Sequence, residues 1–124
     1  MKPINKTGTV KSGEFSYTRM PRIITAYGET FTIPVRTVAF EEKLNAVRTA
    51  IGEAETVSDT VKEICKGVSL FIGEEAVEKI YPSEKLDELD IDEVMSFWQA
   101  LNYELQRNQN DLLSKYRPAP NIRR

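Results

Sequence analysis

The sequence contains no histidine and only one cysteine, Cys65. Without histidine, a Ser/His or Cys/His nucleophile pair cannot form, and the usual zinc ligand sets cannot be assembled. A single cysteine also excludes a disulfide within the chain. Cys65 follows a helical pattern beside Ile64 and Val68. We therefore interpret it as a small, half-buried apolar residue and not as a reactive thiol.

Long apolar runs are also missing, since no stretch approaches the roughly 18–20 residues needed to cross a bilayer. The first residues, Met1 to Lys6, are followed by Thr, Gly and Ser and not by the apolar segment of a secretory signal. The patterns GxxxxGK[ST], GxGxxG and GxSxG do not occur. We therefore expect a cytoplasmic protein that is not an enzyme, holds no cofactor and makes no membrane contact.

Charge is unevenly distributed along the chain. Residues 1–23 carry five bases and one acid, which gives +4, whereas residues 38–95 carry fifteen acids and six bases, which gives −9. A basic arm can indicate nucleic-acid contact, but this one carries only about one charge every four or five residues, so we favour a solvated arm. The acidic residues between 74 and 93 lack the D-x-D-x-D-G pattern of a calcium loop, so no metal site is expected.

The length suits one domain, which we place at residues 15–116. Within residues 22–35, two β-prone runs flank Gly28-Glu29, and a two-residue link that begins with glycine predicts a type II′ hairpin. Pro34 should end the second strand because it cannot donate a ladder hydrogen bond. Alternation predicts three core-facing residues in this strand: Phe31, Ile33 and Val35. A third short strand is predicted at Phe15 and Tyr17.

Apolar residues at three- and four-residue steps predict the helices, which cover about 38–51, 57–72, 74–81 and 91–116. Gly52 stands where a left-handed C-terminal cap would end the first helix, and Gly67 should kink or end the second. Asp90 and Glu93 have the spacing of a capping box. The fold class is therefore mainly α (α+β), an N-terminal β-hairpin with a mobile arm followed by a small bundle of three to four helices.

The last helix, 91–116, is the element around which we expect the other helices to pack. Its apolar stripe is predicted to be Val94, Met95, Trp98, Leu101, Leu105, Leu112 and Tyr116. Trp98 is the only tryptophan and has the largest apolar surface, so it is expected near the centre of the core. Residues 1–14 are predicted to form a flexible basic arm and residues 117–124 a flexible Arg/Pro tail.

The segment from Phe71 to Pro82, FIGEEAVEKIYP, is followed by the acidic link LDIDE at 89–93 and then by the long helix. This arrangement resembles the tail assembly chaperones of long-tailed bacteriophages and prophages, of the type found with Gram-positive hosts. Those proteins commonly carry a Phe/Leu-x-Gly-Glu-x₅-Ile/Leu-Phe/Tyr helix, a short acidic link and a final amphipathic helix. The resemblance covers roughly residues 38–116.

The resemblance implies a small protein of the infected bacterial cell that binds the tape measure protein, helps recruit tail tube subunits and is absent from the finished virion. It also implies a homo-oligomer. Apolar residues of the last two helical segments are the predicted partner contacts: Val77, Ile80, Tyr81, Leu105, Leu112 and Leu113. Plain core packing is the alternative, which we favour for Val77, Ile80 and Leu105.

Two other functions remain open at this point. A small structural tail or head–tail connector protein would use the edge of the hairpin, Thr30–Val35, to extend a neighbour's sheet. A regulatory protein that binds nucleic acid through its basic arm is the third interpretation, and the less favoured one.

Overall fold

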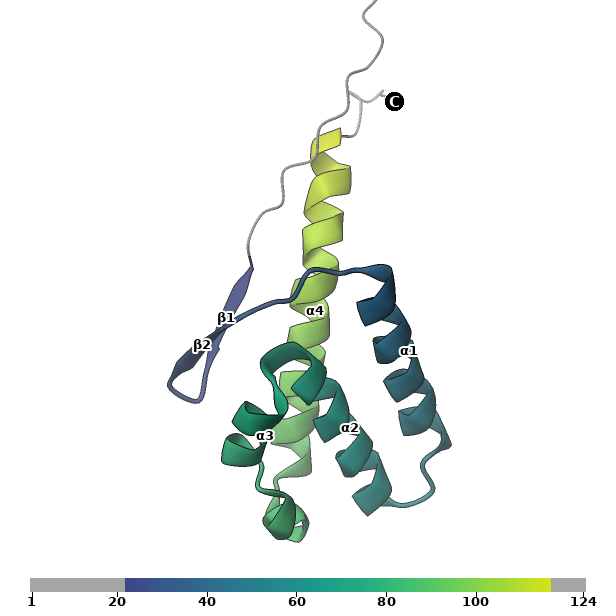
Figure 1. Ribbon diagram of the computed structural model, residues 1–124, viewed down its shortest axis with the longest axis vertical. Helices are drawn as coiled ribbons and strands as arrows, with labels where there is room; N and C mark the ends of the chain where they lie inside the picture. The colour runs from purple at the N-terminus through teal and green to yellow at the C-terminus, as the bar shows by residue number, and fades with distance from the viewer. Residues whose placement is uncertain (1–21, 117–124) are drawn as a thin grey trace, which may run out of the picture.

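The computed structural model describes residues 22–116, and the side chains among them up to Arg107. The chain is mostly helical, with a two-stranded antiparallel hairpin followed by four α-helices and one 3₁₀ helix (Figure 1). The elements are β1 (Ile23–Ala26), β2 (Glu29–Thr32), α1 (Val38–Glu53), α2 (Val57–Ile72), α3 (Glu74–Ile80), η1 (Ser83–Glu88) and α4 (Ile91–Tyr116). The predicted mainly α fold class is confirmed. The predictions for residues 1–14, for 117–124 and for a strand at Phe15 and Tyr17 lie outside the described residues.

The hairpin turn differs by one residue from the prediction. Ala26 pairs with Glu29, so the two-residue link is Tyr27-Gly28 and not Gly28-Glu29. Both link residues have positive φ, 55° at Tyr27 and 76° at Gly28, which is the type I′ and not the type II′ geometry. A tyrosine in this left-handed region is strained by roughly 1–2 kcal/mol. The strain indicates that contacts elsewhere hold Tyr27 in place.

The second strand ends at Thr32, before Pro34, as predicted. Ile33 is buried and Phe31 is half-buried, so both face the helices. Val35 is 50% exposed, and its placement in the core is wrong. The chain has already left the strand there, since the N–H of Thr37 donates to the carbonyl of Val35 at 2.9 Å to begin the turn into α1.

Helix α1 begins at a side-chain cap and ends without a glycine cap. The N–H of Phe40 donates to Oγ1 of Thr37 at 3.0 Å. Gly52 lies inside the helix, and the C-cap is Ala54 with φ −66°, so the predicted left-handed cap at Gly52 is wrong. The N–H of Ala54 donates to the carbonyl of Ile51 at 3.3 Å, which closes the last turn without a left-handed residue.

Helix α2, not α4, is the element that contacts all the other helices. It packs against α1, α3, α4, η1 and β2. Four of its residues form its core face: Val61, Ile64, Val68 and Phe71. Gly67 lies inside α2 and does not interrupt it, contrary to the prediction. Its role is to leave room for the ring of Trp98, which lies directly on it. A Cβ atom at Gly67 would lie 2.4 Å from Cζ3 of Trp98, so glycine permits this close approach.

Asp90 caps the start of α4, since its Oδ1 accepts from the N–H groups of Asp92 at 3.0 Å and Glu93 at 3.3 Å. This half of the predicted capping box is confirmed, whereas the Glu93 carboxylate accepts from the Tyr27 hydroxyl instead. Among the side chains of α4 up to Arg107, the buried ones are Val94, Phe97, Leu101 and Leu105. Trp98 is only partly buried beside Gly67, so its predicted place near the centre of the core is wrong. Met95 was predicted to belong to the apolar stripe, but it is 39% exposed. Val94, Leu101 and Leu105 lie in the core as predicted, whereas Phe97 and not Trp98 is the buried residue between Val94 and Leu101.

The C-terminal part of α4 extends beyond the other helices, as its yellow end shows in Figure 1. Figure 1 also places the hairpin and α1 on opposite sides of α4. Leu105 is the last buried residue along the part of α4 with described side chains. None of the helices in the described range has the length and apolarity needed to cross a membrane.

Candidate partner-binding site

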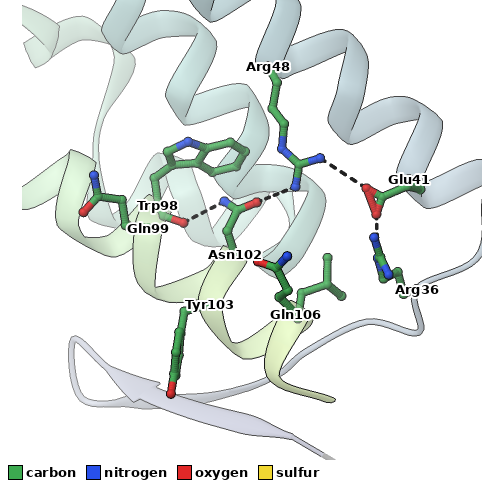
Figure 2. Close-up of a pocket in the computed structure, with 9 residues that line it drawn as sticks. Arg36, Glu41, Arg48, Trp98, Gln99, Asn102, Tyr103 and Gln106 are labelled. Atoms are coloured by element: carbon green, nitrogen blue, oxygen red, sulfur yellow. Dashed lines mark hydrogen bonds and ion pairs between the residues drawn. The ribbon is translucent and has the colours of Figure 1, made fainter. Parts of the chain in front are cut away.

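Two grooves lie on the surface of the helical body. The first has a volume of about 590 Å³ and lies between α1 and α4 (Figure 2). It is lined by Arg36, Glu41, Arg48, Trp98, Gln99, Asn102, Tyr103, Leu105 and Gln106. Most of these side chains are polar, so the arrangement of their hydrogen bonds decides what the groove can do.

The charged groups of this first groove bind one another. Arg48 donates to Oε1 of Glu41 at 3.2 Å and to Oδ1 of Asn102 at 2.8 Å. Nε of Arg36 donates to Oε2 of Glu41 at 2.6 Å, and Nδ2 of Asn102 donates to the carbonyl of Trp98 at 2.8 Å. Figure 2 shows these bonds as one chain from the start of α1 to α4. The network therefore joins α1 to α4 and leaves its carboxylate and amide groups engaged.

This network has a consequence for stability at different pH. Burial raises the pKa of Glu41, but the hydrogen bonds from Arg36 and Arg48 outweigh it and hold the pKa below the ordinary 4.5. Ionised Glu41 thus stabilises the fold above pH 4.5, and this contribution is lost as the pH falls through the lower folded value. We expect Glu41→Gln to lower the free energy of unfolding by up to about 1 kcal/mol at neutral pH.

Urea denaturation at pH 7 and pH 4 measures this effect, and the difference from wild type should be smaller at pH 4. Glu42→Gln is the matched control, because Glu42 is the neighbouring carboxylate on α1 and is exposed. An equal effect of the two substitutions at pH 7 would contradict the role given to Glu41.

The second groove has a volume of about 420 Å³ and lies between α2, α3 and η1. It is lined by Lys62, Cys65, Lys66, Ser69, Glu74, Val77, Glu78, Tyr81, Ser83 and Leu86. Buried and half-buried side chains make its floor: Cys65, Val77, Tyr81 and Leu86. Burial raises the pKa of the Cys65 thiol, and the Glu78 carboxylate adds to the increase. Cys65 is thus a half-buried, protonated thiol, and its predicted half-burial is confirmed.

Charges of opposite sign stand on the two sides of this floor. Lys62 and Lys66 lie one turn apart on α2, and Glu74 and Glu78 lie one turn apart on α3. Oε2 of Glu78 accepts from both the N–H and the hydroxyl of Ser83, at 2.9 and 3.1 Å. These two bonds fix the start of η1 to α3, so the wall of the groove that carries Leu86 is held in place.

Tyr81 connects this groove to the hairpin. The hydroxyl of Tyr27 donates to Oε2 of Glu93 at 2.7 Å, so in the 2.6 Å contact between the two tyrosine hydroxyls Tyr81 is the donor. The ring of Tyr27 also lies edge-on to those of Tyr81 and Phe97, with centroids 5.8 and 5.4 Å away. Burial, followed by the bond that Tyr27 donates to the Glu93 carboxylate, raises the pKa of Tyr27. These contacts hold Tyr27 in its left-handed conformation.

The structure separates the residues that were predicted to contact a partner. Val77 and Tyr81 are buried residues that line the second groove, and Leu105 is a buried residue that lines the first. Ile80 is half-buried against the core. Leu112 and Leu113 are positions of α4 beyond the described side chains. Val77, Tyr81 and Leu105 therefore have core packing as a role whether or not a partner binds.

The α2 side of the second groove was missed by the sequence interpretation. Its members are Lys62, Cys65, Lys66 and Ser69. They follow the i, i+3, i+4, i+7 spacing of one helix face, displaced by one residue from the core positions Val61, Ile64 and Val68. Their regular spacing is the sequence signal that could have identified this face of α2. The sequence does not show, however, that α3 packs beside it and so makes it one wall of a groove.

Among residues 22–116, no three Cys, Asp or Glu side chains are grouped so that they could hold a metal ion. When the chain is compared with protein-family models, with curated proteins and with solved structures, none of them matches. The geometry described above and the resemblance of residues 38–116 are therefore the basis for a proposed function.

Proposed function

We propose that this protein is a phage tail assembly chaperone, which binds the tape measure protein in the host cytoplasm and helps recruit tail tube subunits. The observation that carries the proposal is the projecting part of α4. Leu112 and Tyr116 follow Leu105 by seven and eleven residues, so they continue its helical register beyond the last core layer. A helix that continues its apolar register past its own core is suited to packing against another helix.

The contact suits a chaperone because it is short. One or two turns of apolar helix bury little surface, so each copy binds weakly and can be displaced, while many copies along one long partner hold it together. Burial of apolar surface drives the contact, and high salt should therefore leave it intact.

A structural tail or head–tail connector protein is the second candidate. The observation that favours it is the hairpin, since in the described part of the chain β1 and β2 pair only with each other. Each strand therefore has an edge on which a strand of another subunit can pair. Retention of the protein in purified virions would favour this candidate over the chaperone.

Co-expression with the tape measure protein of the same phage or prophage tests the proposal. Wild type should co-purify with the tape measure protein in 1 M NaCl, whereas Leu112→Asp/Leu113→Asp should lose the complex, because two charged side chains would have to be buried in the contact. The melting temperature of the variant should stay within a few degrees of wild type, because both positions lie beyond Leu105, the last buried residue among the side chains of α4 that the structure describes.

Val38→Asp/Val57→Asp is the matched control, because it also exchanges two apolar residues that are exposed in the first turns of α1 and α2. It should co-purify as wild type does. A folded Leu112/Leu113 variant that still binds the tape measure protein would remove the mechanism proposed for α4.

A further inference from the structure

We propose that the groove between α2, α3 and η1 binds an amphipathic helix whose apolar stripe carries acidic residues along one flank and basic residues along the other. The proposal rests on the proposed function, since it adds a second contact on the same long helical partner. It follows from three features of the groove: its apolar floor, the opposite charges of its two rims and the spacing of those charges.

The floor selects an apolar stripe. Cys65, Val77 and Leu86 come from three different elements and meet in one depression, with Tyr81 beside them. Val77 and Tyr81 are buried, but Cys65 and Leu86 keep part of their surface open to solvent. Covering this surface with leucine-like side chains of a partner removes apolar area from water, which is the main favourable term in such contacts.

The rims select the flanks of the bound helix. Lys62 and Lys66 face it from α2, and Glu74 and Glu78 face it from α3, each pair separated by four residues. Charges that recur every four residues on a bound helix match this spacing, acids toward α2 and bases toward α3. Lys66 also pairs with Glu63 at 3.2 Å and Glu78 accepts from Ser83, so Lys62 and Glu74 are the principal selecting charges.

The opposite signs of the rims also set the direction of the bound helix. Turning an amphipathic helix end for end over the same floor exchanges its two flanks. A helix with acids on one flank and bases on the other therefore fits in one direction only, because the reverse direction places like charges together. Nucleic acid is a poor occupant, since Glu74 and Glu78 would repel its phosphates.

The test uses three designed cysteine-free helical peptides of about six turns with the same leucine stripe. One carries Glu on one flank and Lys on the other, the second carries Glu on both flanks and the third carries Lys on both. Cys65 is the only cysteine of the protein and lies in the groove, so its rate of reaction with an aromatic disulfide reports occupancy. We expect the mixed peptide to slow this rate at least fivefold at a concentration where the other two slow it less than twofold.

Lys62→Glu should change the preference, because the principal charge of the α2 rim then becomes negative, while Lys66 stays paired with Glu63. In this variant the peptide with Lys on both flanks should give the strongest protection of Cys65. Lys43→Glu is the matched control, since Lys43 is an exposed lysine on α1 that does not line the groove. Each rate is compared with that of the same variant without peptide, so that the direct effect of the substitution on the thiol cancels.

Equal protection by all three peptides, or none by the mixed peptide, would overturn the groove proposal, as would an unchanged preference in Lys62→Glu. These outcomes are separate from the test of the chaperone. If the tape measure protein co-purifies but the mixed peptide does not protect Cys65, the groove proposal fails and the proposed function stands. If the peptide protects but the tape measure protein does not bind, the groove binds helices and the proposed function fails.

Discussion

Leu101→Ala is expected to lower the free energy of unfolding by about 2–5 kcal/mol. Leu101 is completely buried in the middle of the core face of α4, between Phe97 and Leu105. Its removal leaves a cavity beside α2, the helix that contacts all the others, so no single element can shift to fill it without disturbing its other contacts. A small domain has only about 5–15 kcal/mol of total stability, so a large part would be lost.

Urea denaturation followed by tryptophan fluorescence or circular dichroism measures this change. Tyr103→Ala is the control, because Tyr103 lies two residues further along the same helix and is 62% exposed. It should change the stability by less than about 0.5 kcal/mol. Similar losses for the two substitutions would show that the core face of α4 has been assigned incorrectly.

Gly67→Ala is expected to destabilise the protein by about 1–3 kcal/mol, although alanine is the better helix former by about 1 kcal/mol. The new Cβ would lie 2.4 and 2.5 Å from Cζ3 and Cη2 of Trp98. The indole ring must then move, and it would lose its edge-on packing against Phe71, whose ring centroid is 6.2 Å away. The emission of Trp98, the only tryptophan, should shift to longer wavelength as the ring becomes more exposed.

Gly52→Ala is the matched control for this substitution. Gly52 also lies inside a helix, but a Cβ there would meet nothing within 4 Å. It should therefore stabilise the protein by up to about 1 kcal/mol. In a Trp98→Ala background, Gly67→Ala should lose its cost, since the ring that it displaces is gone. A cost that persists in that background would mean that Trp98 is not the reason for glycine at 67.

The helices could be predicted from the sequence because each has its own local signals. For α2 and α4, apolar residues recur at three- and four-residue steps, and Asp90 marks the start of α4. The predictions were wrong at positions whose conformation or burial depends on a contact with a residue far away in the sequence. In the sequence, Gly67 favours a break in the helix. The structure shows instead that glycine is needed at 67 because the ring of Trp98, from α4, lies directly on it. Trp98 was placed at the centre by its size, but its ring lies partly buried against Gly67 of α2, and the neighbouring Phe97 is the buried residue.

The hairpin turn shows the same limit. Gly28 was recognised as a turn residue, but a type I′ turn at Tyr27-Gly28 also requires a tyrosine with positive φ. Local preference disfavours that conformation, and the hydroxyl and the carboxylate that hold Tyr27 belong to Tyr81 and Glu93, far along the chain. In the second groove, Val77 and Tyr81 could be predicted from the apolar pattern of α3, whereas Lys62 could not, because the packing of α3 on α2 decides which face of α2 is open.

The anchoring of the hairpin has a consequence during protein synthesis. Tyr27 and Glu93 are separated by 66 residues, so the carboxylate that holds the turn leaves the ribosome long after the hairpin does. At about 5–20 residues per second, the delay is roughly 3–13 s, whereas a hairpin forms within microseconds. A two-stranded hairpin alone is only marginally stable in water. On every nascent chain the two strands therefore pass through seconds without their anchor, with both edges open to a neighbouring chain on the same polysome.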